Sequence, residues 1–187
     1  MSWRDSPSYR GIMEPAAPPI PAPRTPLGPA QVLITGAVAA ERVLETAELA
    51  ARARERYEVP YVTRRRREVH HVYAVPLYDV LAEAGFDVDA RHKRGLLNVV
   101  VVANSEDGYQ VALSLAEIDP EFGARPALLA THYNGAVLTR PTLVLPQDNR
   151  SSRYVRGLCR LCLVNIAPWG LLGSPPTGSH HSFPGTL

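Results

Sequence analysis

The sequence has few of the features that mark metal, membrane or redox proteins by composition alone. It contains only two cysteines in 187 residues, Cys159 and Cys162, whereas a structural zinc site takes about four ligands. No apolar run approaches the roughly 20 residues that a membrane-spanning helix needs. The N-terminal segment also lacks the apolar stretch of a secretory signal. These absences predict a cytoplasmic protein without a membrane association or a cysteine-based zinc site.

An excess of one charge is missing too. Residues 31–166 contain 17 Lys plus Arg and 16 Asp plus Glu, and Lys93 is the single lysine of the chain. A nucleic-acid-binding domain typically has a clear basic excess on one face. Nucleic acid is therefore not an expected partner of the domain as a whole.

Proline is scarce in the middle of the chain and abundant at its ends. Eight of the 18 prolines lie in residues 1–29, four in 167–187 and six in 31–166. Proline-rich polar segments favour extended, disordered chain that cannot bury enough apolar surface to stay ordered. We therefore predict a disordered N-terminal segment (1–30), one folded domain (31–166) and a flexible C-terminal tail (167–187).

The two cysteines form a CxxC spacing that predicts neither a redox nor a metal site. The surrounding sequence "RYVRGLCRLCLVNI" (153–166) is typical of a strand, in which positions three apart point to opposite faces. Redox CxxC motifs usually begin a helix, where the thiolate is stabilised. We expect Cys159 and Cys162 to be buried, reduced and not bonded to each other.

What is present most clearly is a pair of hairpins. In "NSEDGYQVALSLAEI" (104–118), the turn dipeptide Asp107-Gly108 separates two alternating segments. Ser114 followed three residues later by Glu117 predicts a capping box and a helix that begins near Ser114. The dipeptide Asn134-Gly135 predicts a second, two-residue type I′ hairpin.

The other expected elements complete a sheet-rich domain. They are a strand at 31–38 with a bend at Gly36, a helix within 41–57, an edge strand at 57–63, a strand at 68–75, and a helix from Pro76 to 84 that Gly85 ends. With six to eight strands and two or three short helices, the pattern predicts an α+β fold. Its mixed, largely antiparallel sheet is expected to curl into a sandwich or partial barrel.

Five segments in this order carry a resemblance to a known family. They are "VPLYDVLAEAG" (75–85), "VVVVANSEDGYQVALSLAEI" (99–118), "PALLATHYNGAVL" (126–138), "TLVLPQD" (142–148) and "RYVRGLCRLCLVNI" (153–166). Over about residues 31–166 the chain resembles the oxidoreductase molybdopterin-binding domain of the sulfite-oxidase-like family. The resemblance implies the fold of that domain, which in full-length relatives holds a pterin-bound molybdenum. Two dithiolene sulfurs of the pterin and one cysteine thiolate ligate the metal there, because a soft thiolate suits a metal that cycles between oxidation states.

The sequence departs from the family where that thiolate should lie. The corresponding segment "YEVPYVTRRRREVHHVY" (57–73) contains no cysteine, and its nearest counterparts are Val62 and Thr63. Ala74 also stands where relatives usually have glycine. The resemblance therefore implies a molybdopterin-dependent oxidoreductase-like domain that binds a molybdenum–molybdopterin cofactor non-covalently. The alternative is a cofactor-free accessory or binding module that keeps the fold and has lost the redox chemistry, so enzymatic activity is left open.

Candidate binding residues cluster in the segment before residues 75–85 and in the first hairpin. The four arginines 64–67 can grip a pterin phosphate or another oxyanion, make a local contact with nucleic acid or an acidic partner, or form a solvated edge protected from strand pairing by charge. His70 occupies a position at which relatives often have histidine, and its alternatives are a role near the pocket or a hydrogen-bonded structural role. Asp107 and Tyr109 belong to the first hairpin turn, where they have a structural role and can also contact a ligand. No catalytic residue and no metal ligand is predicted, and the expected partner is a pterin cofactor, a small anion or another protein. The candidate cofactor-binding set is Thr63, Arg64, Arg65, Arg66, Arg67, His70, Asp107 and Tyr109.

Overall fold

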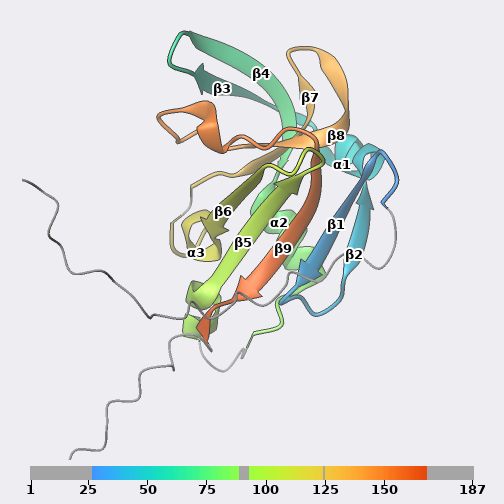
Figure 1. The fold of residues 1–187 in the computed structure, drawn as a ribbon, viewed down its shortest axis with the longest axis vertical. Coiled ribbons are helices and arrows are strands. Elements are labelled where there is room, and N and C mark those ends of the chain that lie inside the picture. The colour runs from blue at the N-terminus through green and yellow to red at the C-terminus, as the bar shows by residue number, and fades with distance from the viewer. Residues whose placement is uncertain (1–26, 89–92, 124, 168–187) are drawn as a thin grey trace, which may run out of the picture.

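The computed structural model describes residues 27–88, 93–123 and 125–167, which form two β-sheets with a few short helices (Figure 1). The five-stranded sheet has the order β2-β1-β9-β5-β6 and the four-stranded sheet the order β3-β4-β7-β8. Among the described strands, only β1 and β9 pair in parallel. The α+β class with largely antiparallel strands is confirmed, but the described residues form nine strands in two sheets, more than the six to eight expected. Most of the predicted N-terminal segment and C-terminal tail lies outside the described residues.

The elements have the following bounds. The five-stranded sheet contains β1 (Gln31–Gly36), β2 (Arg42–Glu45), β5 (Val99–Ser105), β6 (Gln110–Ser114) and β9 (Leu158–Asn165). The four-stranded sheet contains β3 (Glu55–Val62), β4 (Arg67–Pro76), β7 (Leu128–Tyr133) and β8 (Ala136–Val144). The helices are α1 (Thr46–Arg52), α2 (Leu77–Ala84) and α3 (Leu115–Ile118), with the 3-10 helices η1 (Lys93–Asn98) and η2 (Ser151–Arg153). Within these ranges, no helix is long and apolar enough to cross a bilayer.

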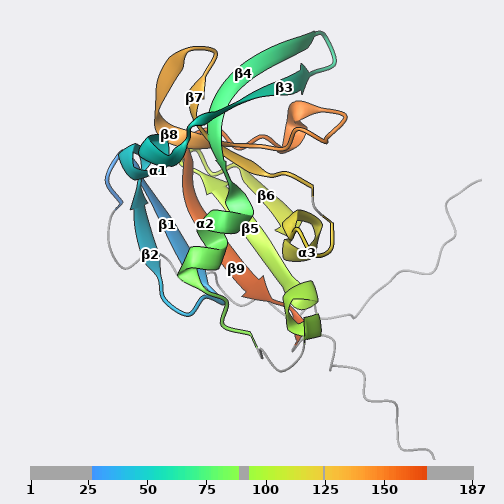
Figure 2. The same ribbon diagram turned by 180° about the vertical axis from the view of Figure 1, so that it is seen from behind.

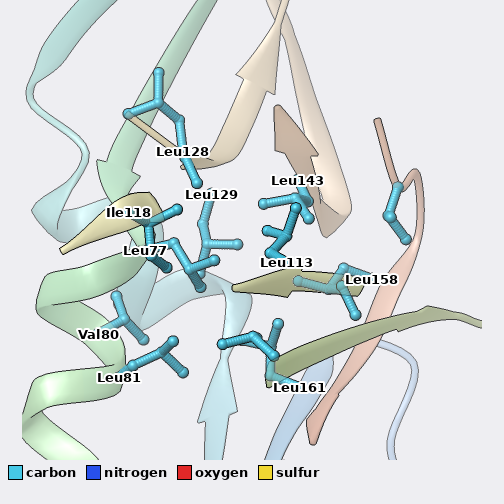
Figure 3. Packing of buried hydrophobic residues seen from close by; sticks show 14 of the residues in the cluster. Leu77, Val80, Leu81, Leu113, Ile118, Leu128, Leu129, Leu143, Leu158 and Leu161 are labelled. Atoms are coloured by element: carbon cyan, nitrogen blue, oxygen red, sulfur yellow. The ribbon is translucent and has the colours of Figure 1, made fainter. Parts of the chain in front are cut away.

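The core lies between α2 and the inner faces of the two sheets (Figure 2). Burial alternates along β5, as expected for a strand with one face against a core. Figure 3 shows Leu77 and Leu81 of α2 pointing toward Leu129 and Leu161, which come from different sheets. A single cluster of buried side chains therefore joins the two sheets.

Both predicted hairpins are confirmed. β5 pairs with β6 across the turn that contains Asp107 and Gly108, and Gly108 has φ +88°. β7 pairs with β8 across Asn134 (φ +48°) and Gly135 (φ +83°), which is the backbone that a type I′ turn requires.

The helix predicted within 41–57 is confirmed as α1, which takes up Thr46–Arg52. The preceding Arg42–Glu45 are extended, because they pair with β1, which places Leu44 in the core. The predicted capping box at α3 was wrong, since Ser114 makes no side-chain capping hydrogen bond. The Glu117 carboxylate accepts a hydrogen bond from Arg153 (3.1 Å) instead. Tertiary pairing overrides local propensity at both places.

Candidate functional site

The predicted site residues come from two segments, the β3–β4 hairpin and the β5–β6 turn, and η2 is hydrogen-bonded to both. The Ser151 hydroxyl donates to the carbonyl oxygen of Val62 (3.0 Å), which ties η2 to the end of β3. The Tyr109 hydroxyl donates to the carbonyl oxygen of Ser152, which ties the β5–β6 turn to η2. Through η2, the structure thus connects Tyr109 to the end of β3 next to Thr63. These hydrogen bonds do not join Thr63 and Tyr109 directly.

The η2 segment is fixed by the partly buried guanidinium of Arg153. Arg153 donates to both carboxylate oxygens of Asp148, at 2.7 and 2.6 Å. These hydrogen bonds and the one to Glu117 raise the pKa of Arg153. The hydroxyl of Tyr154, which is almost fully buried, donates to the carbonyl oxygen of Pro60 (2.7 Å). The loop that bridges the predicted residues is therefore a firmly positioned part of the fold.

The arginines 64–67 form the tip of the β3–β4 hairpin. The Thr63 amide donates to the carbonyl oxygen of Arg66 (2.8 Å), and the Thr63 hydroxyl accepts from the amides of Arg65 (3.2 Å) and Arg66 (3.0 Å). All four arginine side chains are exposed. Among the described residues, only Arg66 of the four has a carboxylate within ion-pair distance, that of Glu68 at 3.7 Å.

His70 lies farther down β4 in an aromatic cluster. Its ring stacks on Tyr61, with the centroids 4.5 Å apart and the planes at 15°. Its Nδ1 is 2.8 Å from the Tyr133 hydroxyl, and its Nε2 is 3.0 Å from a carboxylate oxygen of Glu68. The imidazole is therefore held on both nitrogens and on one face.

Arg156 also contacts this cluster, at Tyr61. Its guanidinium carbon is 5.5 Å from the centroid of the Tyr61 ring, and its Nη2 donates to the Tyr61 hydroxyl (3.1 Å). That is the one hydrogen bond of this guanidinium to the described residues, so its other N–H groups face solvent or a ligand. Burial raises the pKa of Tyr133 although the charge of Arg156 acts in the opposite direction. The Tyr133 hydroxyl therefore stays protonated at neutral pH.

A cleft of about 660 Å³ opens beside these groups, along the β7–β8 hairpin. Arg140 in its wall is already bound, because it donates to Glu106 (3.1 Å), to the carbonyl oxygen of Gly28 (2.9 Å) and to that of Gln31. Arg156 is the wall arginine whose charge is not neutralised by a described carboxylate. The lining comprises Pro29, His70, Glu106, Tyr133, Asn134, Leu138, Thr139, Arg140, Thr142, Arg156 and Gly157.

Of the eight predicted residues, His70 alone lines the cleft. The Asp107 carboxylate accepts from the Ser105 hydroxyl and from the Tyr109 amide, and these hydrogen bonds hold its pKa below the usual range. Its observed contacts are therefore those of a turn residue. Sequence reasoning missed Tyr133, Arg140 and Arg156, which are single residues in three separate segments and share no spacing that could have connected them.

The residues present do not fit a thiolate-bound molybdenum. Val62 offers no donor atom, and the Thr63 hydroxyl is a hard ligand that already accepts two amide hydrogens. Cys159 and Cys162 are free thiols on β9, in the other sheet, and burial raises the pKa of both. Cys162 is buried as predicted, whereas Cys159 is partly exposed. Within the described residues, no group of three or more His, Cys, Asp or Glu side chains could hold a metal ion.

Comparison with known proteins shows the fold. No family model matches the chain, and no curated protein matches its sequence. The crystal structure of the sulfane dehydrogenase SoxCD from Paracoccus pantotrophus is similar to this chain, with a TM-score of 0.57 and 16% sequence identity. The match covers 75% of this chain and 40% of that chain. The protein therefore has, at a distance, the fold of part of a dehydrogenase, and it spans less than half the length of that chain.

Proposed function

We propose that this domain binds a small anionic ligand non-covalently in the cleft beside His70 and Arg156, and that a phosphorylated pterin is the first ligand to test. The observation that carries the proposal is the Arg156 guanidinium, which is held against Tyr61 and keeps N–H groups free for an anion. Guanidinium groups suit phosphate because they donate two parallel hydrogen bonds. The Tyr133 hydroxyl and His70 lie in the same wall.

The volume of the cleft and the fold of the domain support the binding of a small molecule. The cleft volume of about 660 Å³ falls within the range of about 300–1,000 Å³ that is typical of small-molecule sites. The fold shared with part of a sulfane dehydrogenase, together with the sulfite-oxidase-like sequence pattern, makes a molybdopterin-type ligand the natural candidate. In this proposal the arginines 64–67 are not cleft residues, which revises the role that the sequence suggested for them.

The missing thiolate argues against redox chemistry by this domain. Residues 57–73 contain no cysteine, and a threonine hydroxyl would have to lose its proton to replace one. A cofactor-free accessory module that keeps the fold is therefore the second candidate function. The two proposals differ in one measurable property, which is whether the cleft binds a pterin.

Calorimetric titration with a pterin phosphate ester, with the same pterin lacking phosphate, and with inorganic phosphate tests the proposal. We expect the phosphate ester to bind most tightly, and Arg156→Gln to weaken it about 10- to 100-fold, since a hydrogen bond to a charged group contributes roughly 1.5–3 kcal/mol. Arg54→Gln, which changes an exposed arginine outside the cleft, is the matched control. Equal affinity of the wild type and Arg156→Gln, or no binding of any of the three ligands, would overturn the proposal.

Metal content separates the two functions from an active molybdenum enzyme. Protein produced in a cofactor-competent host should contain far less than one molybdenum per chain by mass spectrometry and should not oxidise sulfite. If the fold still accommodates the metal, Thr63→Cys should raise its occupancy; in a cofactor-free module it should not. Stoichiometric molybdenum in the unmodified protein would show that the cysteine is not required.

A further inference from the structure

The β3–β4 hairpin projects from the rest of the domain (Figure 1), and its tip carries the exposed arginines 64–67. The three hydrogen bonds of Thr63 close the tip backbone, so the arginine side chains project from a fixed turn. A preorganised turn loses less conformational entropy on binding than a flexible loop does. We call the tip and the outward face of β4 together the arginine arm, which comprises Arg64, Arg65, Arg66, Arg67, Val69, His71 and Tyr73.

In the arginine arm, three of the four arginines have no carboxylate within ion-pair distance among the described residues, while the His71 ring lies 3.7 Å from the Glu58 carboxylate. The one ion pair of its arginines among the described residues joins Arg66 to Glu68 over 3.7 Å, and the Arg66 side chain is 72% exposed. An exposed pair of this kind contributes little. Arg150 is also exposed, in the loop that Ser151 ties to Val62. Adjacent like charges repel one another, and a negatively charged partner surface would relieve this repulsion. The tip is therefore complementary to an anionic partner.

Apolar side chains continue the charged tip along one face of the sheet. Residues 67, 69, 71 and 73 alternate with 68 and 70 and so share the outward face of β4. Val69 is 61% exposed and Tyr73 is 42% exposed. Across the sheet, Tyr73 pairs with His132 and His132 with Val137, which is 73% exposed, so the apolar strip extends over three strands.

We infer that the arginine arm is a docking surface for an acidic segment of a partner protein in which carboxylates are interspersed with apolar side chains. The arginines match the carboxylates, and Val69, Tyr73 and Val137 match the apolar groups. Nucleic acid is a poorer fit, because phosphates gain nothing from exposed valines and residues 31–166 have nearly balanced charge, 17 Lys plus Arg against 16 Asp plus Glu.

The arginine arm is distinct from the ligand cleft. Strand alternation turns Glu68 and His70 to the opposite face of β4, where His70 contacts Tyr61 and Tyr133. A substitution on one face therefore need not disturb the other. The docking surface can be present whether or not the cleft binds a pterin.

Fluorescence anisotropy with the full chain tests the inference. The probes are a labelled peptide of alternating Glu and Val, the same peptide with Lys in place of Glu, and a single-stranded oligonucleotide of equal negative charge. We expect the Glu–Val peptide to bind most tightly and to weaken as salt is raised. The Arg64→Glu/Arg65→Glu double variant should weaken it at least tenfold, and Val69→Ser should weaken it several-fold.

Two controls make the result specific. Arg54→Glu reverses one charge at the other end of β3, roughly 30 Å away at about 3.3 Å per residue, and should leave the affinity unchanged. Arg156→Gln should also leave it unchanged, which separates this surface from the cleft. Circular dichroism should show the double variant folded, because the tip hydrogen bonds involve the backbone and Thr63. The inference is overturned if the Glu–Val peptide does not bind, if the oligonucleotide binds as tightly, or if Arg54→Glu weakens binding as much as the double variant.

Discussion

One methyl group at Gly36 should decide whether the two halves of the five-stranded sheet can pair. Gly36 has φ +92°, and a Cβ atom there would lie 2.1 Å from the carbonyl oxygen of Leu163. The same oxygen accepts the Ala37 amide hydrogen at 2.8 Å. Because β1–β9 is the parallel pair that connects β1 and β2 to the remaining strands, Gly36→Ala should force these two strands apart.

The magnitude follows from three contributions. A left-handed backbone conformation costs an ordinary L-residue about 1–2 kcal/mol. Overpacking against backbone that cannot rotate away costs about 1–3 kcal/mol, and loss of the Ala37 hydrogen bond costs about 1 kcal/mol. We therefore expect Gly36→Ala to lower the free energy of unfolding by roughly 3–6 kcal/mol.

Gly108 provides a control with a similar φ and open space around an added Cβ atom. It has φ +88°, and a Cβ atom there would meet nothing within 4 Å. Gly108→Ala should therefore show only the conformational cost of about 1–2 kcal/mol. The difference between the variants isolates the contact with β9.

Urea unfolding followed by circular dichroism measures both variants. With a slope of about 2 kcal/mol per molar urea, the midpoint of Gly36→Ala should lie about 1–2 M below that of Gly108→Ala. Equal midpoints would refute the argument, because they would show that β1 and β9 do not approach as closely as the structure has them.

Three further predictions concern the loop that borders the site, the two thiols and the dependence of stability on alkaline pH. Tyr154→Phe should lower the free energy of unfolding by about 1–3 kcal/mol in the same urea assay, because it leaves the Pro60 carbonyl without its 2.7 Å hydrogen bond; an unchanged midpoint would contradict that contact. Cys159 and Cys162 should react slowly with a thiol reagent in the native protein and rapidly in urea, with the partly exposed Cys159 first; fast labelling of both, or a bond between them, would contradict the burial and the divergent strand positions. Stability should also fall at alkaline pH. Burial raises the pKa of Tyr57 from 10.0 to about 12 and raises the pKa values of both thiols above 9.0. The free energy of unfolding should therefore be flat at neutral pH and decline as the pH rises from about 9 toward 12. A free energy of unfolding that rises over this range would contradict the prediction.

The parts of the fold that local chemistry determines could be predicted from the sequence. Turn dipeptides such as Asp107-Gly108 specify the backbone that joins two strands, and the edge position of β3 follows from Pro60, which cannot donate a ladder hydrogen bond. The segment Arg42–Glu45 could not be predicted, because Glu, Arg, Val and Leu fit either a helix or a strand and only the pairing with β1 decides between them. The sequence left a sandwich and a partial barrel as alternatives, because strand pairs far apart in the chain, such as β4 and β7, leave no local signal.

The candidate site was predicted only in part for the same physical reason. His70 was found because a family pattern marked its position, but Arg156 and Tyr133 join it only through contacts between β3, β7 and the loop before β9. The arginines 64–67 were selected because four like charges in succession are rare. Since they lie close to His70 in sequence, they were assigned to the same binding site.

The strand itself separates these two features. Once residues 67–76 form β4, neighbouring side chains point to opposite faces, so the aromatic cluster around His70 and the outward face next to the arginine tip become different surfaces. A ligand in the cleft would meet a single unneutralised guanidinium, that of Arg156, which suits a monoester phosphate. A partner at the tip would meet four guanidinium groups around one turn, a charge density that a small monoanion cannot match. A substitution that abolishes ligand binding in the cleft would leave the outward face intact, and this independence is why the binding experiments on Arg156 and on Arg64 can give different answers.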